Sequence, residues 1–173
     1  MSQIPTALSG CYIRSWRDHD ELSLARYANN RAVWLNLLDS FPHPYAAADA
    51  RAWIDSSSRS QPEAHFAIEY EGVAVGGIGL QLHAGVLSKM ASLGYWIGEP
   101  YWGKGIGTAV VDAFTRFALS AHDLVRLEAR VFSWNTASSR VLEKCGFRQE
   151  ARLMKRIWKD GSILDEIVFA KTT

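Results

Sequence analysis

Apolar and polar residues follow two different periods along this chain. Apolar side chains recur at helical spacing between Ile106 and Phe117, which predicts a helix over residues 106–119. Residues 91–98 alternate instead with the two-residue period of a strand, and successive side chains of a strand point to opposite faces. One face is expected to carry Leu93, Tyr95 and Ile97, and the other Ser92, Gly94 and Trp96.

The same criteria assign elements along the whole chain, with turns at Glu71-Gly72 and Asp160-Gly161. Strands are predicted at residues 12–16, 65–70, 73–82, 91–98, 124–132, 149–158 and 164–170. Helices are predicted at residues 18–28, 31–38, 46–56, 106–119 and 136–145, and the prolines of residues 41–45 favour an irregular segment there. The order predicts an α+β fold: a mixed, mostly antiparallel sheet of about seven strands with about four helices.

Composition narrows the class of protein. Hydrophobic residues are 48% and charged residues 21% of the 173, which is typical of one globular domain, and we expect residues 1–173 to form it. The net charge of +1 does not favour nucleic acid as a partner. No apolar run reaches membrane-spanning length and no signal peptide is read, so a cytoplasmic protein is expected. Two cysteines and five scattered histidines fit no metal-site spacing.

A glycine-rich loop, with Gly103, Gly105 and Gly107, joins the strand at 91–98 to the helix at 106–119. Glycines let the backbone approach a ligand closely, and the free amides at a helix start attract negative charge. This unit is therefore a candidate phosphate or pyrophosphate site. A nucleotide-binding P-loop would need Ser or Thr where Gly105 stands, and a dinucleotide fold would need a different glycine spacing early in the chain. A glycine-rich connection without a ligand is the remaining alternative.

A second polar pair follows the next predicted strand. Asn135 can cap the helix at 136–145. Ser138 lies one and two turns before Leu142 and Cys145, on the side expected to face inward. A buried hydroxyl needs a partner, which is either a ligand or a backbone carbonyl one turn earlier.

Together, the two motifs resemble the GNAT acetyltransferase superfamily, and in particular the ribosomal-protein N-terminal acetyltransferases. Residues 102–107, Trp-Gly-Lys-Gly-Ile-Gly, match the pyrophosphate signature except at Trp102, where a basic or amide residue is usual. Residues 41–45, 93–97, 135–147 and the closing Asp160-Gly161 and Asp165 carry further resemblance to that branch. The likeness extends over residues 10–170.

The resemblance implies acetyl-CoA as the cofactor, wedged between the strands at 91–98 and 124–132. Its pantetheine arm would pair with the backbone of residues 95–97. The positions that match the cofactor-binding residues of the family are Tyr95, Trp96, Ile97, Trp102, Gly103, Lys104, Gly105, Ile106, Gly107, Thr108, Asn135 and Ser138.

The resemblance also implies direct attack of a neutral amine on the thioester, with Ser138 protonating the leaving thiolate. A backbone amide near Ile97 or Gly98 would stabilise the charge on the thioester oxygen. Ser92 stands where relatives often carry Glu or Asp as the base, so Glu128 or Glu69 would act through water, unless each is a structural carboxylate. A covalent route through Cys145 is disfavoured, because a small residue beside Gly146 is expected to fill space.

The acceptor is an amine that the sequence does not name. Trp34, Phe41, Tyr45 and the loop at 86–90 are candidates to line its site. The branch resemblance and the lack of an evident base favour a protein N-terminus, whose amine has a pKa of about 8 against about 10.4 for lysine. A small-molecule amine and a non-catalytic acyl-CoA sensor stay open as alternatives, and so does a homodimer.

Overall fold

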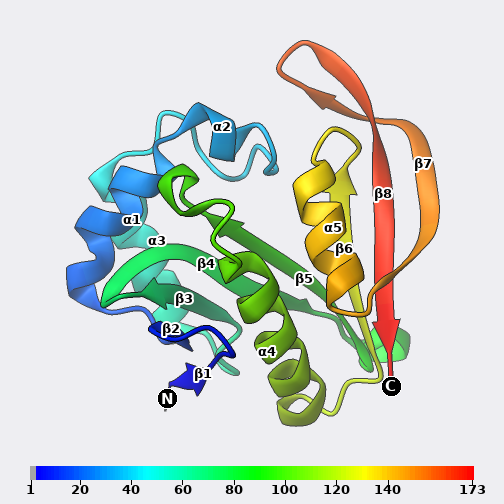
Figure 1. Cartoon of the computed structure of the whole chain (residues 1–173), viewed down its shortest axis with the longest axis horizontal. Helices are drawn as coiled ribbons and strands as arrows, with labels where there is room; N and C mark the ends of the chain where they lie inside the picture. Colours follow the sequence, from blue (N-terminus) through cyan, green and yellow to red (C-terminus); the bar gives the residue numbers. More distant parts are fainter. Residues whose placement is uncertain (1–2) are drawn as a thin grey trace.

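One sheet of eight strands runs through residues 3–173, the part of the chain that this computed structural model describes (Figure 1). Its spatial order is β1-β2-β3-β4-β5-β6-β8-β7, and every neighbouring pair is antiparallel except β5 and β6, which are parallel. The strands are β1 Ile4–Pro5, β2 Cys11–Arg14, β3 His65–Tyr70, β4 Val73–Leu82, β5 Met90–Ile97, β6 Arg126–Phe132, β7 Arg148–Lys159 and β8 Ser162–Thr172. The mixed, mostly antiparallel sheet is confirmed, and the two-residue β1 is the strand that the pattern did not predict.

Helices cover both faces of this sheet (Figure 1). Within the described residues they are α1 Glu21–Ala28, α2 Arg31–Trp34, α3 Ala47–Arg59, α4 Ile106–Ala121 and α5 Thr136–Lys144. The prediction of a helix over residues 31–38 was wrong in length. After Trp34 the amides of Asn36 and Leu37 bond to carbonyls three residues earlier, so the chain tightens into turns instead of continuing the helix.

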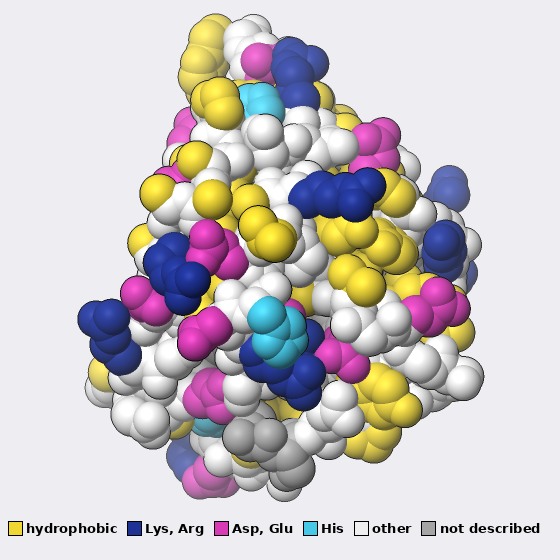
Figure 2. Space-filling view, turned by 90° about the vertical axis from the view of Figure 1, so that its left-hand side faces the viewer, with side chains coloured by type: hydrophobic (Ala, Val, Ile, Leu, Met, Phe, Trp, Pro, Cys, Tyr) yellow, Lys and Arg dark blue, Asp and Glu magenta, His cyan; other side chains and the backbone are white. Residues whose placement is uncertain are grey.

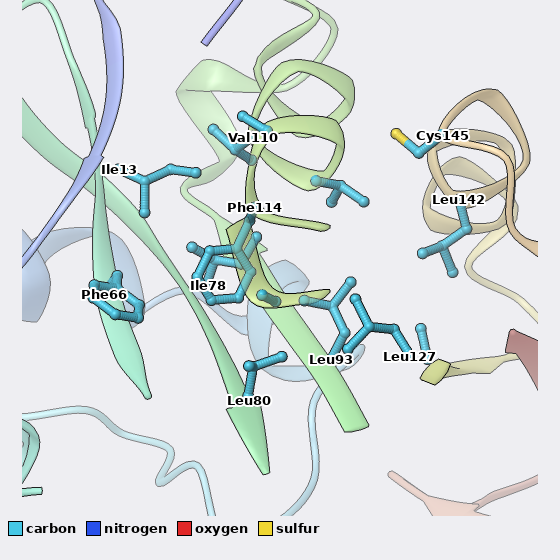
Figure 3. Packing of buried hydrophobic residues seen from close by; sticks show 14 of the residues in the cluster. Ile13, Phe66, Ile78, Leu80, Leu93, Val110, Phe114, Leu127, Leu142 and Cys145 are labelled. Carbon is cyan, nitrogen blue, oxygen red and sulfur yellow. The ribbon is translucent and has the colours of Figure 1, made fainter. Parts of the chain in front are cut away.

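The main core lies between the sheet and the pair α4 and α5. Figure 3 shows Leu93 and Leu127 meeting from neighbouring strands, with Phe114 of α4 and Leu142 of α5 directed at the same layer. All four are at most 5% exposed. Burying a side chain of this size stabilises the fold by about 1.5–3 kcal/mol. This packing fixes α4 and α5 against the two strands that carry the candidate site.

A second core lies on the opposite face, where α1 and α3 pack. Leu24, Ala50 and Ile54 from the helices contact Ala67 and Ala74 from β3 and β4. The surface on the side of α1 carries basic and acidic side chains interspersed (Figure 2). No helix among residues 3–173 has the length and apolar character needed to cross a membrane.

Candidate active site

The strands β5 and β6 separate along most of their length. Their parallel pairing is limited to residues 90–92 and 126–128. Beyond these residues β5 stays paired with β4 as far as Ile97, and β6 stays paired with β8 as far as Phe132. A gap between residues 93–97 and 129–132 therefore opens in the middle of the sheet, and we call it the strand gap.

Backbone groups of β5 point into the strand gap. The Gly98 amide donates to the carbonyl of Val75 at 2.8 Å, on the side of β4. Because successive amides of a strand alternate in direction, the amides of Tyr95 and Ile97 point away from β4 and toward the gap. This edge can pair with an extended ligand, as predicted for residues 95–97. The amides of Ile97 and Gly98 were suggested to stabilise the thioester oxygen. The suggestion is wrong for Gly98, because its amide is bonded within the sheet, whereas the amide of Ile97 points into the gap.

The glycine loop lies at the open end of the strand gap. Gly103 and Gly105 have φ angles of 74° and 80°, and a Cβ on either residue would meet nothing within 4 Å. Gly105 is the N-cap of α4, and the first backbone bond of that helix runs from Ala109 to the Gly105 carbonyl. The amides before Ala109 are therefore oriented out of the helix end, as a pyrophosphate site requires.

Trp102 ties this loop to β5. Its indole Nε1 donates to the carbonyl of Ile97 at 2.6 Å, across the open end of the strand gap. The indole is 46% exposed. Trp102 thus positions the glycine loop by a hydrogen bond to the strand, which gives a structural reason for a tryptophan at a position where a basic or amide residue was expected.

Asn135 begins α5 beside the strand gap. Its Oδ1 accepts the backbone amide of Ser138 at 3.1 Å, so the capping role predicted from the sequence is confirmed. This bond leaves the Asn135 Nδ2 amide as the group that could bind an arm of the cofactor.

Two variants of Asn135 are expected to separate these roles. Asn135→Ala should destabilise the protein by about 1 kcal/mol, because the cap is lost, whereas Asn135→Asp should keep its stability. Both should weaken acetyl-CoA binding if Nδ2 contacts the cofactor. Thermal denaturation and calorimetric titration measure the two effects, and full acetyl-CoA affinity in Asn135→Asp would leave Asn135 with the capping role alone.

Ser138 and Tyr95 form a hydroxyl pair at the side of the strand gap. Their oxygens are 2.9 Å apart, although the residues are 43 positions apart in sequence. Burial raises the pKa of Tyr95 to about 12, with the bond to Ser138 opposing that rise, so the phenol stays protonated near neutral pH. Tyr95 can then donate to Ser138, which leaves the serine proton free for a ligand. The alternation of residues 91–98 placed Tyr95 on this face, but no local signal paired it with Ser138.

The suggested bases occupy ion pairs. Both carboxylate oxygens of Glu128 accept from guanidiniums, Oε2 from Arg126 at 3.1 Å and Oε1 from Arg130 at 2.9 Å. Glu69 is bound by Arg14 at 2.5 Å. These contacts favour the structural role for both carboxylates, because a base must have a lone pair free for the incoming proton.

Cys145 is also engaged in packing. It is buried, and its Sγ donates to the carbonyl of Thr108 at 3.4 Å. Burial raises the pKa of the thiol, which disfavours the thiolate needed for a covalent route. Cys11 and Cys145 are both free cysteines.

Aromatic side chains lie on the opposite face of β5, toward α2. Phe41 contacts Trp96 edge to face, with ring centroids 5.6 Å apart, and Tyr45 at 5.0 Å. Tyr45 is only 6% exposed and belongs to the second core, so the prediction that it lines the acceptor site is corrected: it supports Phe41 from behind. The prediction that the loop at 86–90 lines the acceptor site is also wrong. The amide of Val125 donates to the carbonyl of Lys89, which places this loop at the closed end of the strand gap.

Trp34 is held by the tip of the β7–β8 hairpin. The ammonium of Lys159 lies 3.5 Å from the centre of the Trp34 ring and 2.6 Å from an Asp39 carboxylate oxygen. Lys159 is 2% exposed, and Arg31 forms a further ion pair with Asp160 in the hairpin turn. The hairpin thereby fastens α2 over this side of the molecule, a contact between residues 120 positions apart that no local pattern could predict.

A hollow of about 290 Å³ lies between these parts, lined by Ala32, Leu35, Asn36, Trp102 and Trp134. It joins the segment around α2 to the glycine loop and to the loop after β6. Among the described residues, no group of His, Cys, Asp and Glu is arranged to hold a metal ion. The site therefore offers backbone amides, hydroxyls and aromatic surface to its ligands.

The separation of β5 and β6 and the glycine loop at the start of α4 agree with an enzyme that binds a phosphate-bearing acyl donor. Residues 11–148 match the family model described as an acetyltransferase (GNAT) domain. The chain belongs to this family and is an N-acetyltransferase. Acetyl-CoA, the cofactor predicted from the sequence, agrees with the free amides at the start of α4 and the strand gap.

One known relative matches most of the chain in sequence, and two solved structures share the fold over nearly all of it. The SPbeta prophage-derived uncharacterized N-acetyltransferase YokL of Bacillus subtilis is 29% identical over 80% of this chain and 77% of its own length. The structure of RimL, a ribosomal L7/L12 α-N-protein acetyltransferase in complex with coenzyme A, superposes with a TM-score of 0.85 at 18% identity, covering 99% of this chain and 98% of RimL. RimJ of Mycobacterium smegmatis has a TM-score of 0.85 at 24% identity, covering 99% of this chain and 86% of RimJ.

Proposed function

We propose that this protein transfers the acetyl group of acetyl-CoA to the α-amine at the N-terminus of a protein. The observation that carries the proposal is the strand gap, with the glycine loop at its open end and the hydroxyl pair at its side. The amides from Gly105 to Thr108 bind the pyrophosphate, and the edge of β5 at Ile97 pairs with the pantetheine arm. Acetyl-CoA supplies the activated acyl group, and the chain orients it.

The residues around the gap then divide the proton transfers. Ser138 donates its proton to the departing sulfur while Tyr95 donates to the serine oxygen. The Tyr95 amide, which is directed into the gap and lies deeper in it than the Ile97 amide, stabilises the charge that grows on the thioester oxygen. Trp96 and Phe41 form an apolar wall on the acceptor side.

An N-terminal α-amine is the acceptor that fits these residues best. About one-tenth of α-amines are neutral at pH 7, against fewer than one lysine amine in a thousand. Since both Glu128 oxygens are engaged by arginines, the site lacks a strong carboxylate base there, and a weakly basic amine needs none. The ribosomal acetyltransferases among the structural neighbours support the same choice, with ribosomal proteins as the candidate substrates.

Two peptides test this acceptor. A peptide that begins with Ser or Ala is expected to be acetylated at its α-amine, whereas the same sequence with a blocked N-terminus and an internal lysine should not react. Mass spectrometry of both products, with acetyl-CoA as donor, locates the added acetyl group. Acetylation of the blocked peptide, or activity confined to polyamines and aminoglycosides in a parallel panel, would disprove the N-terminal acceptor and leave the acetyl-CoA site standing.

A further inference from the structure

A serine and a histidine form a hydrogen-bonded pair at the closed end of the strand gap. Ser92 is the last residue of β5 that pairs with β6. Its Oγ lies 3.1 Å from Nε2 of His83, which follows the end of β4. Ala91 and Leu93 face the main core, so Ser92 faces the opposite side of the sheet, the side of Trp96 and the acceptor.

The backbone beyond Ser92 leaves room for an acceptor on this side. Gly94, the next residue on the same face, is exposed, and a Cβ built there would meet nothing within 4 Å. Ser92 and Trp96 flank this opening along β5. An amine that approaches the strand gap over Gly94 therefore has the aromatic wall on one side and the Ser92 hydroxyl on the other.

The other polar groups near Ser92 are already committed. Glu128 is opposite Ser92 on β6, and both of its carboxylate oxygens accept from arginines. Arg126 also binds Glu150 on β7, at 2.6 Å. His65, on the same face of β3, is packed against Trp53, and its pKa is lowered by burial. Lys89, in the loop before β5, pairs with Asp123. His83 is the group beside Ser92 whose ring nitrogen reaches the Ser92 oxygen and can accept its proton.

We propose that Ser92 and His83 relay the proton that the acceptor amine loses. The proposal rests on the proposed function and names the route by which the amine proton leaves the site. As the amine nitrogen forms its bond to the acetyl carbon, the C–S bond breaks and its electron pair goes to sulfur. The amine proton passes through water in the opening over Gly94 to Ser92 Oγ, while the Ser92 proton moves to Nε2 of His83. Ser138 protonates the sulfur and regains a proton from the solvent. His83, which is partly exposed, then returns its proton to water.

The relay predicts a pH dependence of kcat/KM that a purely structural role of Ser92 and His83 would not produce. Log kcat/KM should rise with a limiting slope of two at acid pH in the unmodified enzyme, because the amine and His83 must both be neutral. In His83→Asn the limiting slope should fall to one, since only the amine then titrates. Activity at pH 8 should fall about tenfold, less than the 10²-fold of a base in direct contact, because the serine hydroxyl intervenes.

The experiment measures kcat/KM for the Ser-initiated peptide from about pH 5 to 9, within the range in which thermal denaturation finds each variant folded. Ser92→Ala should lose the second slope like His83→Asn, and Ser92→Thr, which keeps the hydroxyl, should retain it. The matched control His19→Asn changes an exposed histidine that precedes α1 and should keep a slope of two.

A limiting slope of one in the unmodified enzyme would overturn the relay. So would a slope of two that survives in His83→Asn, with activity lowered equally at every pH, because that pattern is the signature of a packing role. Failure of the unmodified enzyme to acetylate any amine would overturn the proposed function and the relay with it. Activity on the peptide with an unchanged slope in the variants overturns the relay alone.

Discussion

Replacing Gly105 by aspartate is expected to abolish the stabilisation of this protein by acetyl-CoA. At a hundredfold excess over Kd, a ligand adds about 2.7 kcal/mol, or roughly 5 to 10 °C in melting temperature for a domain of this size. A Cβ at Gly105 meets nothing within 4 Å, so the new carboxylate would project into the open space at the start of α4. There it would occupy and repel the pyrophosphate.

The left-handed backbone at Gly105 calls for a control. Its φ is 80°, where a side chain is strained, so Gly105→Asp is also expected to lower the melting temperature of the free protein. Gly72 has a φ of 81° and equally open surroundings in the β3–β4 turn. Gly72→Asp therefore carries the same backbone strain and should keep the full acetyl-CoA shift. An undiminished shift in folded Gly105→Asp would remove the pyrophosphate from this loop.

Ser138→Ala is expected to lower kcat by about 10²-fold, the low end for a general acid, with acetyl-CoA affinity nearly unchanged. The thiolate would then leave without the proton of Ser138, the hydroxyl that Tyr95 contacts at 2.9 Å. Steady-state kinetics with varied acetyl-CoA separate kcat from binding. Ser139→Ala is the matched control, since Ser139 adjoins the site and its hydroxyl donates to the Asn135 carbonyl at 3.4 Å.

The hydroxyl pair of Tyr95 and Ser138 also predicts how kcat changes in variants of both residues. If Tyr95 acts by donating to Ser138, Tyr95→Phe should lower kcat less than Ser138→Ala does. The double variant should be no slower than Ser138→Ala alone, because residues that act as one unit are not additive. Additive losses would mean that Tyr95 and Ser138 act independently, and full turnover in Ser138→Ala would reduce the serine to a structural role in α5.

The sequence by itself determined those features whose causes are local. The two-residue alternation of residues 91–98 assigned Tyr95 and Ser92 to opposite faces because successive strand side chains point to opposite sides. Glycines before an amphipathic helix predicted the loop at the start of α4 because only glycine adopts positive φ there at little cost. Asn135 was readable as a cap because its partner amide is three residues away.

Only the tertiary structure decided which of these features meet and what each is free to do. The strand gap exists because β5 and β6 stop pairing after Ser92, while β5 stays paired with β4 and β6 with β8. The sequence of a single strand does not determine how far that strand pairs with a neighbour. The contacts of Ser138 with Tyr95 and of Lys159 with Asp39 join positions 43 and 120 residues apart. The sequence left Glu128 open as a base or as a structural carboxylate, and its ion pairs with Arg126 and Arg130 favour the structural role. Chemistry that depends on a free lone pair or a shared proton is set by such contacts, because the partners of a side chain decide which of its states remain available.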